Sequence, residues 1–205
     1  MGHISEYRAA LKGKILDKAL QLFFANGIRA VKMDDIAKSL SISKRTLYEL
    51  YDNKEILLFE CLKKNKEHRD KEMIEHLSKC SNVMDILLET YRMSVDEFRR
   101  MSPCFFSEIS RYPQVIDFIE KKRVHDHEQF MLFIQRGIGE GFFREDVNYE
   151  LVLMVHDSIR RTIIEGDLYN KYGMDGLFFN LIFVSFRGVC TKKGVEVLDR
   201  YLARQ

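Results

Sequence analysis

A short segment near the amino terminus gathers side chains whose types could bind a nucleic acid. Residues 43–49 read SKRTLYE. The guanidinium of Arg45 can pair with both acceptors of guanine, whereas lysine, threonine and tyrosine side chains can bond backbone phosphates. The carboxylate of Glu49 would be repelled by phosphates unless it accepted a hydrogen bond from the amino group of cytosine. The segment therefore predicts contacts to both the phosphates and the bases of a DNA duplex.

Two short helices and a three-residue turn would position this segment. The apolar periodicity predicts helices over 33–40 and 44–51, separated by Ser41, Ile42 and Ser43. A separation of this length is typical of a helix-turn-helix, whose second helix enters the major groove. The hydroxyl of Ser43 is suited to cap that second helix, because it can accept a hydrogen bond from an unpaired backbone amide.

The second of these helices is predicted to have an apolar face and a polar face. Successive residues turn by about 100° around a helix, which separates two sets of side chains. The set expected to pack inward is Leu47, Leu50 and Tyr51. The set expected to face a duplex is Arg45, Tyr48 and Glu49, flanked by Lys44 and Thr46.

The neighbouring segments complete an expected set of four helices. A helix with Ile15, Ala19 and Phe23 on one face would end at Gly27, which has no β-carbon to clash in a left-handed conformation. A fourth helix is expected to begin near Lys54. Free amides and the positive end of the helix dipole favour an anion there, so Lys54 is predicted to hold a phosphate.

The rest of the chain predicts longer helices, over about 82–101, 105–111, 114–140, 149–170 and 175–189, with a last one to about 203. Only 2 prolines and 11 glycines interrupt the 205 residues, which favours helices over strands and tight turns. We therefore expect an all-α protein, with a helix-turn-helix DNA-binding domain at 1–53 and a linking helix that leads into a helical domain at 54–205.

Two helices near the carboxy terminus are apolar on nearly every side. Both the segment 177–186 and the helix before it would need burial on faces that one subunit rarely covers near a chain end. We expect them to pair with their symmetry mates across a two-fold axis. The alternative is a helix in the centre of one subunit's core. The predicted interface residues are Leu151, Val155, Ile159, Phe178, Leu181, Ile182 and Phe186.

The charge and cysteine content narrow the classes of protein that fit. The net charge is only +2, but residues 1–70 hold 14 Lys and Arg against 10 Asp and Glu, so the basic excess is amino-terminal. The 4 cysteines show no CxxC spacing and no signal peptide is recognised, so we expect free thiols in a reducing cytoplasm. No apolar run is long enough to predict a membrane span.

Other groups of reactive side chains have simpler explanations. His68, Glu72, His76 and Cys80 repeat every four residues, as metal ligands on a helix could, but a stripe on a charged surface is the commoner explanation. A redox role for Cys104 lacks a second cysteine nearby in sequence. The chain has no phosphate-binding glycine loop, G-x-S-x-G elbow or H-E-x-x-H pair. We therefore expect no metal, no cofactor and no enzymatic activity.

The segment VKMDDIAKSLSISKRTLYELYDNKEILL resembles the signature of the tetracycline-repressor (TetR) family, through its I-A, S-K-x-T-L-Y and K-E-x-L spacing. The signature covers residues 14–60, roughly a quarter of the chain, and the later helices resemble the family in number, length and order. The resemblance implies a helical homodimer that represses nearby promoters, with a carboxy-terminal domain that dimerises and binds a small inducer. Carried over by position, it implies phosphate contacts for Thr46, Tyr48 and Lys54, base or phosphate contacts for Lys44 and Arg45, and the cap for Ser43.

Two residues depart from the family pattern. Lys32 stands where many members cap the second helix with threonine, so we expect that cap to be lost and Lys32 to meet a phosphate instead. Ser41 stands where many members have glycine, so it would hold a left-handed backbone at some energetic cost.

Aromatic and polar residues of the later helices are candidates for a ligand pocket. The residues named on this basis are Tyr91, Phe106, His127, Phe130, Met154 and Arg160. Aromatic residues at helical spacing also occur in ordinary cores, so a plain hydrophobic core is the alternative.

Together these features predict a DNA-binding transcription regulator, a repressor released from a palindromic operator by a small-molecule ligand. Two subunits would place their recognition helices in successive major grooves, with half-sites about 34–36 Å apart or slightly more. The alternatives are a helical dimer that contacts only proteins and an enzyme that acts on a small molecule.

Overall fold

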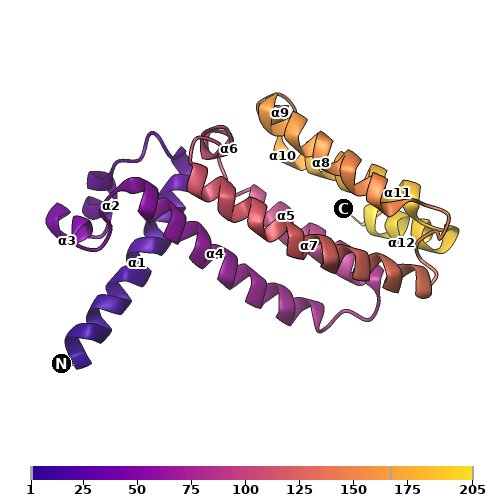
Figure 1. Ribbon diagram of the computed structural model, residues 1–205, viewed down its shortest axis with the longest axis horizontal. Helices are drawn as coiled ribbons and strands as arrows, with labels where there is room; N and C mark the ends of the chain where they lie inside the picture. The colour runs from indigo at the N-terminus through magenta and orange to yellow at the C-terminus, as the bar shows by residue number, and fades with distance from the viewer. Residues whose placement is uncertain (1, 167, 205) are drawn as a thin grey trace. The chain divides into compact units, whose positions relative to one another are not determined.

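The computed structural model describes residues 2–166 and 168–204, and helices connected by loops account for that part of the chain (Figure 1). The predicted all-α class is confirmed. The first six helices are α1 (Gly2–Asn26), α2 (Met33–Ser39), α3 (Lys44–Tyr48), α4 (Lys54–Leu77), α5 (Val83–Phe98) and α6 (Pro103–Ile109). They are followed by α7 (Pro113–Gly139), α8 (Tyr149–Glu165), α9 (Leu168–Tyr172), α10 (Met174–Phe179), the π-helical segment η1 (Asn180–Val184), α11 (Ser185–Val189) and α12 (Lys192–Leu202).

The chain forms two compact units. The amino-terminal unit comprises residues up to Glu72 together with Arg100–Ile119, and the carboxy-terminal unit comprises Met73–Arg99 and the residues from Glu120 onward. The helices α4 and α7 each contribute residues to both units. The sequence instead predicts a division after residue 53, between the helix-turn-helix and the linking helix. This division concerns function, and it stays a prediction.

The core of the amino-terminal unit forms where the apolar faces of α1 to α4 meet. Ile15, Ala19 and Phe23 recur at four-residue spacing on α1 and are completely buried, as the periodicity predicts. Burying a side chain of the size of Phe or Leu stabilises a fold by about 1.5–3 kcal/mol. The aromatic ring of Phe105 on α6 meets that of Phe24 edge to face at 4.8 Å between centroids, so α6 belongs to this core.

The joint after α1 brings the backbone of α6 close. Gly27 has φ +82°, the left-handed conformation predicted for it. A β-carbon at Gly27 would lie 2.9 Å from the Cβ of Cys104 on α6, so only glycine fits here. The amide of Ser102 donates to the carbonyl of Phe24, and the amide of Arg29 donates to Glu108 at 2.7 Å. The first loop is therefore fixed to α6 by both packing and hydrogen bonds.

The carboxy-terminal unit has a core of its own. Its fully buried side chains come from α5, α7 and α12 and from the loop after α7. The largest of them are Met84, Ile134, Phe143 and Leu198. The ring of Phe183 stacks on Tyr201 and meets Tyr91 edge to face at 4.7 Å, which joins η1, α12 and α5.

Several predicted helices differ from those in the structure, and α5, expected to reach residue 101, ends at Phe98. The helix expected to reach residue 51 ends at Tyr48, because the chain turns to begin α4, where Asn53 accepts a hydrogen bond from the amide of Ile56. The helix expected over 149–170 ends at Glu165, next to Gly166, a residue that weakens helices. The helix expected over 175–189 contains the wider turns of η1. At the first residue of η1, the side-chain amide of Asn180 donates to the carbonyl of Gly176. The described helices include none long and apolar enough to cross a membrane.

Candidate nucleic-acid interface

The turn between α2 and α3 has the geometry of a helix-turn-helix. The side chain of Ala37 on α2 is buried. The backbone carbonyl of Ala37 accepts a hydrogen bond from the amide of Ile42 at 3.1 Å. Ser41 has φ +53°, and it is the one non-glycine residue with positive φ in the described chain. The predicted left-handed serine is therefore confirmed, and the turn holds backbone strain that glycine would relieve.

Ser43 caps α3 as predicted. Its Oγ accepts a hydrogen bond from the amide of Thr46 at 3.0 Å, and the two hydroxyls lie 2.7 Å apart in a second hydrogen bond. The cap satisfies an amide that the helix itself cannot pair. It also fixes the start of a helix only five residues long, whose outer side chains depend on it for their direction.

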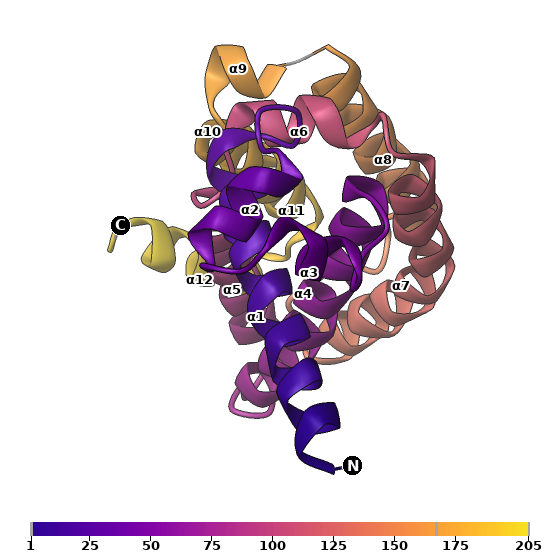
Figure 2. The same ribbon diagram turned by 90° about the vertical axis from the view of Figure 1, so that its left-hand side faces the viewer.

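The two faces of α3 separate as the 100° rotation predicts. Leu47 and Tyr51 are buried, and Leu50 packs against the same core. The residues on the exposed side are Lys44, Arg45, Tyr48 and Glu49, with Thr46 half-buried beside them. Figure 2 looks onto this part of the amino-terminal unit, with α2 and α3 toward the viewer.

The cations of this face pair with carboxylates of the same unit. The Nε atom of Arg45 lies 2.9 Å from Glu49, and the Nζ atom of Lys44 lies 2.8 Å from Asp34 on α2. These carboxylates raise the pKa values of both cations, chiefly through the side-chain hydrogen bonds, so each stays charged at neutral pH. The side chain of Arg45 is 88% exposed, and solvent screens such pairs, so a phosphate or a base edge can replace the carboxylates.

Lys32 lies at the amino-terminal end of α2 without capping it. Its side chain makes no cap hydrogen bond, as an ammonium group cannot accept one. Asp35 partly replaces the missing cap, because its carboxylate accepts a hydrogen bond from the amide of Lys32 at 2.9 Å. The Lys32 side chain is exposed next to this helix end, and its predicted phosphate contact stays a prediction.

Lys54 has an internal role that the sequence did not reveal. Its Nζ donates to the carbonyls of Ile28 at 2.9 Å and of Val31 at 3.2 Å, in the loop between α1 and α2. Burial lowers its pKa. An ammonium group has three donors, so one remains for a phosphate after these two bonds. The acceptors are backbone carbonyls more than twenty residues away, and no local pattern marks them.

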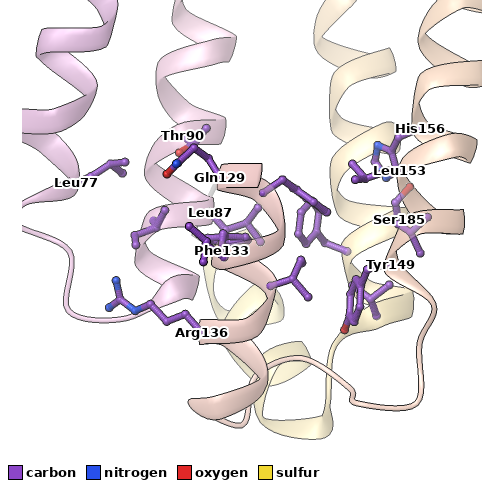
Figure 3. Close-up of a pocket in the computed structure, with 17 residues that line it drawn as sticks. Leu77, Leu87, Thr90, Gln129, Phe133, Arg136, Tyr149, Leu153, His156 and Ser185 are labelled. Carbon is purple, nitrogen blue, oxygen red and sulfur yellow. The ribbon is translucent and has the colours of Figure 1, made fainter. Parts of the chain in front are cut away.

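The carboxy-terminal unit contains a cavity of about 640 Å³ that opens to solvent on one side (Figure 3). Its walls come from α5, α7, α8 and α11, and the last residue of α4, Leu77, completes them. Phe130 lies on this wall, as expected of a pocket residue. Polar groups that the sequence pattern does not mark also line it: Thr90, Gln129, Tyr149, His156 and Ser185.

The other residues predicted for a pocket lie elsewhere. Tyr91 packs on Phe183 in the core, and Phe106 belongs to the amino-terminal unit, beside Phe105. His127 is exposed and lies 3.4 Å from Glu150, and Met154 is exposed on α8. The side chain of Arg160 lies outside the described residues. Residues that line a cavity come from helices distant in sequence, so spacing within one helix does not identify them.

The residues predicted for a dimer interface fall into three groups. Leu151, Val155 and Ile159 lie on α8, with 57%, 57% and 38% of their surface exposed. Phe186 is buried and lines the cavity. The side chains of Phe178, Leu181 and Ile182 lie outside the described residues. Leu151, Val155 and Ile159 thus form an exposed apolar face of α8, which the described part of the chain does not cover.

The histidine stripe on α4 consists of separate pairs. His68 lies 3.3 Å from Glu72, and His76 lies 2.7 Å from Glu89 on α5. The described residues contain no group of three or more His, Cys, Asp or Glu side chains placed to hold a metal ion. The four cysteines are free, and burial raises the pKa of Cys61 to about 12 and that of Cys190 to about 11.

Comparison with known proteins agrees with this geometry. A family model described as "Bacterial regulatory proteins, tetR family" matches residues 15–61, which hold the second half of α1, all of α2 and α3, and the start of α4. The biofilm operon regulator IcaR of Staphylococcus epidermidis is 49% identical over 45 residues, 22% of this chain and 24% of that protein, so this match spans about a quarter of the relative's length.

Two further relatives extend over most of the chain. The transcriptional repressor KstR2 of Mycolicibacterium smegmatis is 24% identical over 150 residues, 70% of this chain and 73% of that protein. A regulator from Saccharomonospora viridis, whose structure was solved with choline, has the same fold, with a TM-score of 0.71 and 17% identity over 90% of this chain and 100% of that one. The capped α3, the left-handed turn at Ser41 and the match over residues 15–61 thus identify a helix-turn-helix of the tetR type at the amino terminus, and the relatives support a DNA-binding transcriptional regulator.

Proposed function

We propose that the chain is a repressor that binds a palindromic operator as a homodimer and leaves it when a small molecule occupies the cavity of the carboxy-terminal unit. The outer face of α3 carries this proposal. Lys44, Arg45 and Tyr48 are exposed there, on a helix that is capped by Ser43 and anchored by the buried side chain of Leu47. A short helix with this arrangement is suited to enter a major groove.

Binding of DNA would exchange partners within the existing ion pairs. Arg45 would leave Glu49 for the two acceptors of guanine, and Lys44 would leave Asp34 for guanine or a phosphate. Glu49 would then accept from a cytosine amino group or lie at the edge of the groove. The remaining phosphate contacts are assigned to Thr46 and Tyr48 by their hydroxyls, and to Lys32 and Lys54 by their charge.

The exposed apolar face of α8 supports a dimer. Exposed apolar surface of this kind marks an interaction site on many proteins, and a two-fold axis lets one face cover its own copy. Leu151, Val155 and Ile159 would form the centre of this interface, with Met154 between them. A two-fold dimer requires an inverted repeat, because each subunit contacts an equivalent half-site.

The cavity and the linking helix support regulation by a ligand. The helix α4 begins at Lys54, which is bonded to the loop before α2, and ends at Leu77, which lines the cavity. A molecule in the cavity therefore contacts the helix whose other end belongs to the DNA-binding unit. Release follows if the molecule binds the conformation with low DNA affinity more tightly by a few kcal/mol.

A selection of bound DNA from a random pool tests this proposal, and an inverted repeat is the expected product. Affinity for the recovered sequence would then be measured by fluorescence anisotropy. Arg45→Ala is expected to weaken binding by about tenfold or more, because a bidentate pair to a base contributes about 1–3 kcal/mol. Tyr48→Ala is expected to have an effect of the same size, because a hydrogen bond to a charged phosphate contributes about 1.5–3 kcal/mol. The affinity of the unaltered protein should fall steeply with salt.

Lys79→Ala is the matched control. Lys79 is an exposed cation that pairs with Glu75 four residues away, as Arg45 pairs with Glu49, but it lies in the segment after α4. Its removal should leave DNA affinity within about twofold, since an exposed pair of this kind contributes little. If Arg45→Ala and Tyr48→Ala behave like Lys79→Ala, α3 does not bind DNA, and contact with another protein becomes the better explanation of this domain.

A further inference from the structure

The cavity of the carboxy-terminal unit has an apolar lining over most of its wall. Leucine, isoleucine, valine and phenylalanine side chains make up most of the described lining residues, among them Phe130, Phe133 and Phe186. Its volume of about 640 Å³ lies within the range of sites for small organic molecules, about 300–1,000 Å³. A molecule that fills it must be largely apolar, because few of its polar groups would find a partner.

The cavity offers no unpaired charge to an ionic ligand. Arg136 is the one ionised side chain among the described lining residues, and its Nε lies 2.6 Å from Glu140. No Asp or Glu lines the cavity within the described chain. A carboxylate would have to displace Glu140, which also accepts a hydrogen bond from the amide of Val83 at 2.8 Å, and an ammonium group would find no carboxylate among the described lining residues. An ionised group without a partner costs far more free energy than a neutral one, so both ions are disfavoured.

His156 is the polar side chain best placed to select a ligand. It reaches the cavity from α8, with its ring 6.4 Å from that of Phe186, and within the described chain it has no hydrogen-bond partner. Burial lowers its pKa, although Asp157 opposes this, so the imidazole is neutral at pH 7. A neutral imidazole has one donor and one acceptor, and both suit a hydroxyl or a carbonyl group.

Two hydroxyls of the cavity already have partners, and that of Thr90 donates to the sulfur of Met73 at 3.8 Å. The hydroxyl of Tyr149 is already engaged, because it donates to the carbonyl of Arg144 at 2.6 Å. Figure 3 shows Tyr149 and Arg136 toward one end, and Thr90, Gln129 and His156 toward the other. Thr90, Gln129 and His156 thus lie away from the end of the cavity that holds Arg136.

We propose that the regulatory ligand is an uncharged, largely apolar molecule with a hydroxyl or carbonyl group that hydrogen-bonds to His156. This inference rests on the proposed regulation by a ligand and names the chemical class that the cavity selects. It excludes fatty acids and quaternary amines as the preferred ligands, although aromatic rings line part of the wall.

Three probes with the same ten-carbon chain test the proposal: decan-1-ol, decanoate and decyltrimethylammonium, each below its micelle concentration at pH 7. Each would displace N-phenyl-1-naphthylamine, a neutral fluorophore, from the full-length protein, which contains no tryptophan to interfere. Decanol is expected to bind at least about tenfold more tightly than either ion, because removing an unpaired charge from water costs more than the roughly 1.4 kcal/mol that a tenfold ratio represents.

Variants of His156 test the assigned contact. His156→Leu is expected to weaken decanol binding about fivefold, the equivalent of one hydrogen bond of about 1 kcal/mol, while the fluorophore still binds. His156→Gln keeps a donor and an acceptor and should retain most of the affinity. His127→Leu is the control, since His127 is exposed, does not line the cavity, and should leave decanol binding unchanged.

Several results would overturn the proposal. Equal or tighter binding of either ion would show that the cavity does not select neutral molecules. Failure of the fluorophore to bind the folded protein would show that the cavity takes no such ligand. Equal decanol affinities of the His156→Leu protein and the unaltered protein would remove His156 from the site. None of these measurements includes DNA. A failure of the ligand proposal can therefore be distinguished from a failure of the DNA-binding proposal, which the Arg45→Ala and Tyr48→Ala variants test.

Discussion

Lys54 is a single cation to which two roles can be assigned. The sequence predicts a phosphate contact from its position in the first turn of α4, and the structure adds two hydrogen bonds to the carbonyls of Ile28 and Val31. These bonds fix the loop that leads into α2. The same side chain would therefore stabilise the domain before any DNA is bound.

Lys54→Ala is expected to lower the free energy of unfolding by about 1–2 kcal/mol, because two carbonyls lose a charged donor. Urea denaturation followed by circular dichroism measures this change. Lys32→Ala is the control, because Lys32 is an exposed lysine of the same domain whose side chain makes no cap bond, and its effect should stay within about 0.5 kcal/mol. Equal stabilities of the two variants would mean that water replaces the Lys54 bonds at no cost.

At the scale of elements, the turn between α2 and α3 is fixed by local interactions. Ser41 holds the left-handed conformation, Ser43 caps the next helix, and Ala37 is buried where the turn folds back. The turn positions α3 at the expense of strain at Ser41.

Ser41→Gly should relieve that strain and raise the free energy of unfolding by about 0.5–1 kcal/mol, because glycine adopts positive φ without a steric clash. Ser94→Gly, within α5, provides the opposite expectation: a loss of about 0.5–1 kcal/mol from a regular helix. Thermal denaturation of both variants measures the difference. A destabilised Ser41→Gly protein would show that the serine side chain contributes more than its backbone conformation costs.

The sequence predicts elements of this local kind well. The cap at Ser43, the strained turn at Ser41 and the buried face with Leu47 all depend on residues within ten positions of one another. The lining of the cavity depends instead on packing between α5, α7, α8 and α11, so Phe130 was identified, whereas His156 was not. The π-helical turns of η1 likewise have no signal in apolar periodicity, which stays uniform through that segment.

At the scale of the whole molecule, the exposed face of α8 bears on the number of subunits. Three of the seven residues predicted for the interface lie on this face, at four-residue intervals. That spacing produces one continuous stripe along a helix, which is the form that helix pairing across a two-fold axis requires.

Val155→Glu is expected to convert a dimer into a monomer, because each subunit would place a carboxylate in the apolar interface without a partner. Light scattering coupled to size-exclusion chromatography gives the mass directly. Ile74→Glu is the matched change: Ile74 is 71% exposed on α4, away from this stripe, and its replacement should leave the mass unaltered. A dimeric Val155→Glu protein would place the interface elsewhere.

The close approach of Gly27 and Cys104 has a practical consequence. Burial keeps the thiols of Cys61 and Cys190 protonated near neutral pH, and it also raises the pKa of the half-buried Cys80, whereas Cys104 is exposed. A maleimide dye is therefore expected to react first at Cys104, next to the joint where α1 ends. The native chain thus provides a labelling position beside its own DNA-binding domain, and fluorescence there would report movement of that joint in real time.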